Sequence, residues 1–117
     1  MNPIYFDDAV ELIQKGLRDL MIRKQKDYGP GNIMAFGEFG VLVRLNDKVE
    51  RLKNLLTKNV NPSNESIDDT WQDIANYALI ALMLKRNIFV LPLKDTEETT
   101  VAIKEATKPT LVGGRDC

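Results

Sequence analysis

The sequence of 117 residues contains no histidine and a single cysteine, Cys117. The absence of histidine excludes Ser-His-Asp and Cys-His catalysis, and it excludes zinc sites with histidine ligands. One cysteine cannot form a disulfide within the chain, which is typical of proteins from the reducing cytosol. The N-terminus also lacks the basic and then apolar pattern of a secretory signal peptide. We therefore expect a cytoplasmic protein.

The sequence also lacks a long hydrophobic run and an excess of charge of one sign. Its most apolar segment, 77–84, is far shorter than the roughly 20 residues that cross a bilayer. Sixteen Lys and Arg residues nearly balance seventeen Asp and Glu residues, whereas a nucleic-acid interface needs clustered basic residues to neutralise phosphates. We expect no membrane partner and no direct nucleic-acid binding, but a small anion could still be held by a few local basic residues.

Apolar residues recur at spacings of three and four in three long segments, which predicts an all-α fold. The expected helices span 3–26, 41–58 and about 65–87, the last with Ser63 or Asn64 as N-cap. Residues 33–40 are expected to be a connector with at most one short helical turn. The third helix is apolar almost all round after its first turns, with Trp71 on its core face, so we expect its second half to be buried on all sides.

The C-terminal quarter of the sequence has weaker patterns. Residues 88–93 form a short β-prone run, and Asp95 followed by Glu98 resembles a capping box that opens a weak helix to about residue 107. We therefore divide the chain into a helical nucleotide-binding domain, 1–93, and a short helix with a tail, 94–117, used in assembly or loosely attached. The nucleotide assignment depends on the motifs described next.

The strongest chemical pattern is a set of acidic residues on two helices. Asp47 and Glu50 are three residues apart, and Asp69 and Asp73 are four apart, so each pair shares a helix face. Two antiparallel helices could bring these four carboxylates together around Mg²⁺, which prefers oxygen ligands. Basic residues alternate with them at the same helical level and could hold phosphate oxygens. These basic residues are Arg44, Lys48 and Arg51.

The same mixture of charges suits a network of salt bridges equally well, with Asp69 and Asp73 paired to the basic residues of 44–51. The residue types alone do not decide between a metal–phosphate site and such a network. A second signal is the turn 24–32, where glycines allow a close backbone approach, Lys24 and Lys26 could meet a phosphate, and Tyr28 could stack on a base. An ordinary glycine-terminated helix with favourable lysines in its last turn explains that turn as well.

The order of these motifs resembles the phage and bacterial family called nucleotide modification associated domain 1, over roughly residues 8–86. The resemblance is carried by Lys26-Asp27-Tyr28-Gly29, Phe36, Gly40, Arg44, Asp47-Lys48, Arg51-Leu52, Glu65-Ser66-Ile67, Asp69-Thr70, Asp73-Ile74 and Asn76-Tyr77. It implies nucleotide handling, with Lys26, Tyr28, Arg44, Lys48, Arg51 and Asn76 contacting the nucleotide. It also implies a distant relationship to the MazG-like all-α NTP pyrophosphatases, and hence a MazG-like bundle of three long helices plus short helices, completed by oligomerisation.

The pyrophosphatase group carries Glu-Glu-x-x-Glu on one helix and Glu-x-x-Asp on the next, where they bind Mg²⁺ and nucleotide phosphates. The corresponding residues here are Asn46-Asp47-x-x-Glu50 and Thr70-x-x-Asp73, so Asn46 and Thr70 replace two of the expected glutamates. The resemblance implies Asp47, Glu50 and Asp73 as catalytic residues, and these three with Asp69 as Mg²⁺ ligands. The site is therefore poorer in acid than that of its suggested relatives.

Three functional hypotheses follow. The first is a Mg²⁺-dependent, pyrophosphohydrolase-like enzyme acting on (deoxy)nucleotide phosphates in phage nucleotide metabolism, active in the host cytoplasm. The second is a deoxynucleotide kinase without a P-loop, because the family also resembles such a phage enzyme. The third is a module that binds or sequesters nucleotides without catalysis. Each predicts a nucleotide or deoxynucleotide ligand and a homo-oligomer.

Overall fold

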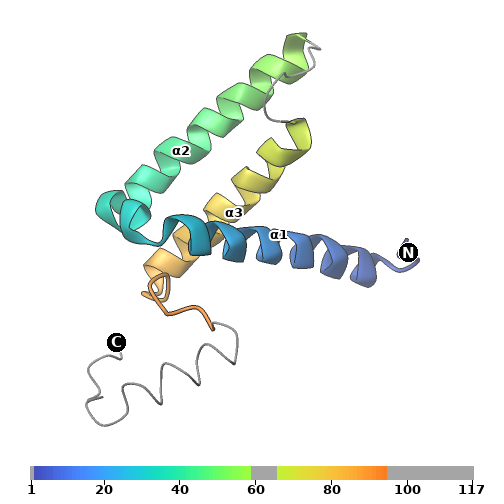
Figure 1. The fold of residues 1–117 in the computed structure, drawn as a ribbon. Helices are drawn as coiled ribbons and strands as arrows, with labels where there is room; N and C mark the ends of the chain where they lie inside the picture. Colours follow the sequence, from blue (N-terminus) through green and yellow to red (C-terminus); the bar gives the residue numbers. More distant parts are fainter. Residues whose placement is uncertain (1, 59–65, 95–117) are drawn as a thin grey trace.

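The computed structural model describes residues 2–58 and 66–94, and these residues form three α-helices and no strand (Figure 1). The helices are α1 (Phe6–Tyr28), α2 (Gly31–Lys58) and α3 (Ile67–Lys85). The prediction of an all-α fold with three long helices is confirmed. The expected caps Ser63 and Asn64 and the expected helix after Asp95 lie outside the described residues.

α1 begins and ends close to where the sequence places it. Asp7 and Asp8 lie in its first turn, where the helix dipole favours negative charge. Gly29 ends the helix with a positive φ of 72°, and its N–H donates to the carbonyl of Gln25 at 2.8 Å. This left-handed conformation is easily adopted only by glycine, so the turn that separates α1 from α2 depends on this residue.

The connector expected at 33–40 is helical, and it forms the first part of α2. The only residue with non-helical angles inside α2 is Gly37 (φ 68°, ψ −160°), so the helix kinks there. Gly40 allows the two parts to meet closely, because a Cβ atom at this position would overlap the Cβ of Phe36. Gly37 and Gly40 therefore produce a kinked helix rather than an irregular loop.

Side-chain and backbone caps define both ends of α3. The Ser66 hydroxyl accepts a hydrogen bond from the Asp69 N–H at 2.9 Å, so Ser66 is the N-cap. At the other end the N–H of Ile88 donates to the Met83 carbonyl at 3.0 Å, with Asn87 in the left-handed conformation (φ 58°). This pattern is a Schellman motif, which reverses the chain direction after the helix.

The β-prone run at 88–93 does not form a strand. These residues form turns and irregular structure after α3, and the described residues contain no strand for them to pair with. Phe89 follows the chain reversal by the Schellman motif, and its side chain is buried, whereas Ile88, Val90 and Leu91 are exposed.

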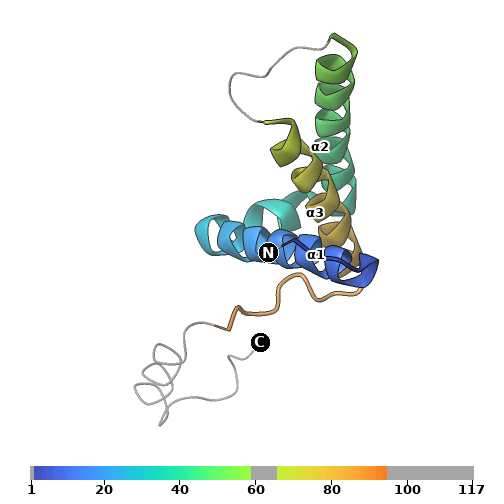
Figure 2. The same cartoon turned by 90° about the vertical axis from the view of Figure 1, so that its right-hand side faces the viewer.

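α2 and α3 lie side by side and antiparallel, and α1 crosses the C-terminal half of α3 (Figures 1 and 2). The antiparallel register is visible in two contacts: Lys48 pairs with Asp73, and Arg51 Nε donates to Thr70 Oγ1. Asn76 Nδ2 of α3 donates to the Leu17 carbonyl of α1 at 3.2 Å. These contacts bring residues from all three helices together near the middle of α3.

The hydrophobic core of the chain is small. Only three large hydrophobic side chains of the described residues are buried, Val41, Leu52 and Phe89, whereas nineteen are exposed. The expectation that the second half of α3 is buried on all sides is wrong for the single chain, since Leu79 and Leu82 are exposed; Trp71 is exposed too. None of the described helices has the length and apolar character required to cross a membrane.

Candidate functional site

A cavity of about 400 Å³ lies where α1, α2 and α3 meet. This volume lies within the range of small-molecule binding sites, about 300–1,000 Å³. The residues that line it come from all three helices and from the segment after α3. They are Met21, Lys24, Gln25, Tyr28, Gly29, Asn32, Ile33, Arg44, Lys48, Asp73, Asn76, Tyr77, Ile80 and Phe89.

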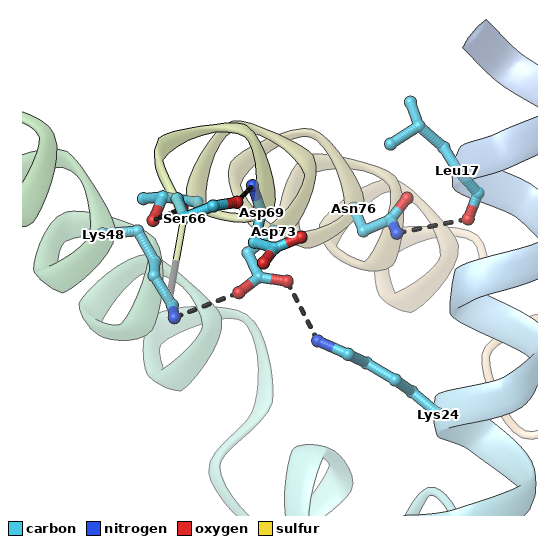
Figure 3. Close-up of polar contacts among 8 residues, drawn as sticks. Leu17, Lys24, Lys48, Ser66, Asp69, Asp73 and Asn76 are labelled. Carbon is cyan, nitrogen blue, oxygen red and sulfur yellow. Dashed lines mark hydrogen bonds and ion pairs between the residues drawn. The ribbon is translucent and has the colours of Figure 1, made fainter. Parts of the chain in front are cut away.

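Asp73 is the only acidic residue in the lining, and it lies between two lysines (Figure 3). Its Oδ1 is 2.9 Å from Lys24 Nζ of α1, and its Oδ2 is 3.0 Å from Lys48 Nζ of α2. One carboxylate on α3 therefore connects the other two helices. The Asp73 side chain is 13% exposed, and that of Lys48 is 24% exposed, so these contacts are screened less than surface ion pairs.

Burial and the two lysines act on the pKa of Asp73 in opposite directions. Burial raises the pKa, because it disfavours the charged carboxylate, while the hydrogen bonds and charges of Lys24 and Lys48 lower it. The lysines dominate, so the net pKa of Asp73 lies below the ordinary value. The carboxylate is therefore ionised at neutral pH and is a weak proton acceptor.

Arg44 adds a third positive charge to the cavity. It is partly buried, lines the cavity, and forms no hydrogen bond or ion pair with any of the described residues. Lys24, Arg44 and Lys48 carry three positive charges against the one negative charge of Asp73, which leaves an excess of two in the lining. A guanidinium presents five donors in a planar fork suited to phosphate or carboxylate oxygens.

Asn76 lines the cavity, and its side-chain amide joins α3 to α1 through a hydrogen bond. The residue is buried, and because its Nδ2 donates to the Leu17 carbonyl, its Oδ1 is oriented away from that carbonyl (Figure 3). Oδ1 is buried and has no hydrogen-bond partner among the described residues. A buried unpaired amide oxygen costs free energy, and a donor on a ligand in the cavity would remove that cost.

The remainder of the lining is mainly apolar or aromatic. Met21, Ile33 and Ile80 contribute aliphatic or thioether surface, and Tyr28, Tyr77 and Phe89 contribute rings. Tyr28 is strongly exposed and lies at the end of α1. A cavity with cationic donors together with apolar and aromatic surface can accept a ligand that has an anionic part and a flat or apolar part.

Five of the residues predicted from the sequence lie in this cavity: Tyr28, Arg44, Lys48, Asp73 and Asn76. Five others are not part of its lining. These are Lys26, Asp47, Glu50, Arg51 and Asp69. The predicted ion pairing is observed at Asp73, whereas the phosphate site stays a prediction.

Four of the predicted residues outside the cavity are exposed or contact other residues. Glu50 is exposed and pairs with Lys53 at 3.3 Å. Asp47 is also exposed. Asp69 is exposed near the start of α3, where its N–H is capped by Ser66. Arg51 contacts Thr70, which is fully buried, so the replacement of glutamate by Thr70 places a hydroxyl rather than a carboxylate against this arginine.

The four predicted Mg²⁺ ligands are not grouped. No three acidic, histidine or cysteine side chains in the described part of the chain lie where they could hold a metal ion. Both oxygens of Asp73 are already paired with lysines, which a cation would have to displace. The described residues therefore do not fit a magnesium centre within one chain, and the metal assignment stays a prediction.

Comparison with known protein families identifies the family of this chain. Residues 24–84 match the family described as nucleotide modification associated domain 1, which is more than half of the chain. The chain belongs to this family. No curated protein and no solved structure matches it. Of the residues lining the cavity of this nucleotide modification associated domain 1 protein, all except Met21 and Phe89 lie inside the matched span.

The sequence named Lys24 only as a possible phosphate contact of the turn 24–32, and it did not predict the lining residue Phe89. Lys24 is the first residue of the turn 24–32, and its spacing of four from Leu20 and three from Met21 places it on the same side of α1 as these residues. That signal was available in the sequence. Phe89 depends on the chain reversal at Asn87, which no periodicity indicates.

Proposed function

We propose that this nucleotide modification associated domain 1 protein binds a nucleotide or deoxynucleotide in the cavity between its three helices. The observation that carries the proposal is Arg44, a partly buried guanidinium without a partner in the described residues, in a lining with two excess positive charges. A phosphate group would balance this charge, and charge-assisted bonds to Arg and Lys are among the stronger hydrogen bonds in proteins.

In the proposed complex the phosphates contact Arg44, with Lys24 and Lys48 beside them. The base or sugar lies against the aromatic and apolar part of the lining, where Tyr28 is exposed at the rim and Phe89 forms part of the wall. Asp73 holds the two lysines in place through its ion pairs. Because its pKa is lowered, Asp73 serves to position charge and not to accept a proton at neutral pH.

The reaction proposed first is hydrolysis of nucleotide phosphates in the host cytoplasm of a phage, dependent on Mg²⁺. Transfer of phosphate between deoxynucleotides is the alternative, and binding without catalysis is the third possibility. The cavity supports nucleotide binding more directly than either reaction, because its only carboxylate is paired with two lysines.

A thermal-shift screen tests this proposal. A ligand that binds only the native state raises its melting temperature, so we expect a shift with at least one nucleoside or deoxynucleoside phosphate and none with the corresponding nucleosides. Each nucleotide is tested with and without Mg²⁺. The absence of any shift across mono-, di- and triphosphates of all bases under both conditions would contradict the proposal.

Product analysis of the nucleotides that shift then separates the three reactions. Monophosphate with pyrophosphate indicates hydrolysis, diphosphates indicate transfer, and unchanged nucleotide at every Mg²⁺ concentration indicates binding alone. If turnover occurs, Asp73→Asn tests the predicted metal ligand. Unchanged turnover in this variant would exclude Asp73 from both the metal site and the catalytic residues.

A further inference from the structure

The cavity between the three helices contains more positive charge than its one acidic residue can balance. Asp73 accepts a hydrogen bond from Lys24 at 2.9 Å and lies 3.0 Å from Lys48 (Figure 3). An ammonium has three N–H donors, so Lys24 can bind an anion without giving up this ion pair. Arg44 forms no hydrogen bond or ion pair with any of the described residues. The lining therefore offers donors from α1 and α2 to an anionic group.

The size of the charge excess indicates which anion fits. Lys24, Arg44 and Lys48 contribute three positive charges against the one negative charge of Asp73, so the excess is two. A phosphate monoester carries about 1.5 to 2 negative charges at neutral pH, because its second pKa is about 6. A single phosphate group would therefore neutralise the lining. Each further phosphate of a di- or triphosphate adds negative charge, and the described residues of the lining include no further cation to match it.

Longer phosphate chains usually bind together with Mg²⁺, and the lining is poorly suited to that ion. Proteins hold Mg²⁺ through one or two carboxylates and the phosphates of the substrate. Asp73 is the only carboxylate in the lining, and both of its oxygens are paired with lysines. A Mg²⁺ ion would have to displace these lysines, and it would add positive charge to a lining that already has an excess of two. Arg44 and the two lysines instead supply the charge that the metal supplies in a magnesium-dependent site.

The uncharged part of the lining favours a phosphate ester with a large organic group over a free phosphate ion. Tyr28, Tyr77 and Phe89 contribute rings to the cavity, and Met21 and Ile80 contribute apolar surface. Inorganic phosphate would leave this surface and most of the volume of about 400 Å³ unused. The base and sugar of a nucleoside would cover it, since aromatic side chains pack well against flat rings.

We infer that the cavity binds a ribonucleoside or deoxyribonucleoside monophosphate, with its phosphate as the dianion and without Mg²⁺. Arg44, Lys24 and Lys48 contact the phosphate, and the nucleoside lies against the aromatic part of the lining. The inference rests on the proposed nucleotide site and names the class of ligand that this site takes. Such a ligand would be the product of the hydrolysis proposed first, and it would be the phosphate acceptor in the alternative transfer reaction.

Matched variants test whether the cations of the lining hold the phosphate. Lys24 and Lys15 both lie on α1, and each pairs with an aspartate at 2.9 Å, but only Lys24 lines the cavity. Lys24→Gln removes one charge-assisted donor and should weaken binding of the monophosphate in EDTA by about tenfold. Lys15→Gln is the control and should leave the affinity nearly unchanged. Equal affinities of the two variants would overturn the assignment of Lys24 to the phosphate.

Calorimetric titration of the wild-type chain is the primary test. The ligands are the common nucleoside and deoxynucleoside mono- and triphosphates and inorganic phosphate, each in EDTA and in Mg²⁺. In EDTA we expect at least one monophosphate to bind about tenfold more tightly than inorganic phosphate and than the triphosphate of the same base. Mg²⁺ should change its affinity by less than about twofold.

Three results would overturn the inference and leave the proposed nucleotide site intact. The first is a triphosphate that binds as tightly as its monophosphate or more tightly, and the second is monophosphate binding that requires Mg²⁺. The third is inorganic phosphate that binds as tightly as the nucleotide, since the nucleoside would then contribute nothing. If no nucleotide binds with or without Mg²⁺, the proposed nucleotide site itself is wrong, and the inference fails with it.

Discussion

The ion pairs of Asp73 should make a measurable contribution to stability, and Asp73→Asn removes their charge while preserving the size of the side chain. Breaking a fully buried ion pair costs about 3–5 kcal/mol, whereas an exposed one contributes about 0–1 kcal/mol. The pair with Lys24 is near the exposed limit, since the lysine side chain is 50% exposed. The pair with Lys48 lies between the limits. We expect Asp73→Asn to lower the free energy of unfolding by roughly 1–3 kcal/mol.

Urea denaturation at neutral pH measures this difference, with Asp47→Asn as the control. Asp47 is exposed on α2 and does not line the cavity, so its substitution should change the unfolding free energy by less than about 0.5 kcal/mol. Equal effects of the two substitutions would refute the reasoning, because they would show that the paired lysines do not distinguish Asp73 from a surface carboxylate.

The pH dependence gives an independent check of the same contacts. The pKa of Asp73 in the folded chain is lowered, so its contribution is fully present above the unfolded pKa, about 3.9. The contribution is lost as the pH falls through the lowered folded pKa. The stability difference between wild type and Asp73→Asn should therefore be constant from pH 7 to pH 5 and shrink below about pH 4. A difference that grows on acidification would contradict the assignment.

Three further substitutions test local features of the fold, each by urea denaturation. Ser66→Ala removes the acceptor for the Asp69 N–H and should cost about 1 kcal/mol, while Ser66→Asp should cost little. Gly37→Ala places a side chain at φ 68° and ψ −160° and should cost about 1–3 kcal/mol, whereas Gly16→Ala, in a regular part of α1 with open space around it, should stabilise the chain. Thr70→Val removes the acceptor of the Arg51 Nε–H and should cost about 1 kcal/mol, with Thr57→Val, an exposed position, as the neutral comparison.

The sequence was sufficient to predict the helices because each has apolar residues at spacings of three and four. It failed at 33–40, where glycine content suggested a connector. Only Gly37 leaves the helical conformation, since isolated glycines weaken a helix without ending it. The apolar residues Leu42, Leu45, Val49, Leu52 and Leu56 recur at spacings of three and four in the sequence, but this series differs in part from the buried side of α2. Leu42 and Leu56 are exposed, whereas Val41 is buried.

The sequence predicted only part of the candidate site, and the reason is the geometry of the helices. Helical spacing shows which residues share a face, but it does not show which way that face is turned in the assembled chain. Asp47 precedes Lys48 by one residue, about 100° around the helix, and only Lys48 reaches the cavity. Asp69 shares a face with Asp73 but lies one turn nearer the start of α3, away from Lys24 of α1.

Calorimetric titration of a nucleotide identified in the screen tests the central claim most directly, using wild type, Arg44→Gln and Arg23→Gln. Both variants lose one guanidinium, but Arg23 is exposed on α1 and does not line the cavity. A charge-assisted hydrogen bond contributes about 1.5–3 kcal/mol, so Arg44→Gln should weaken binding by roughly 10- to 100-fold. Arg23→Gln should leave it nearly unchanged. Equal affinity of Arg44→Gln and wild type would show that the cavity between the three helices does not hold the nucleotide phosphates.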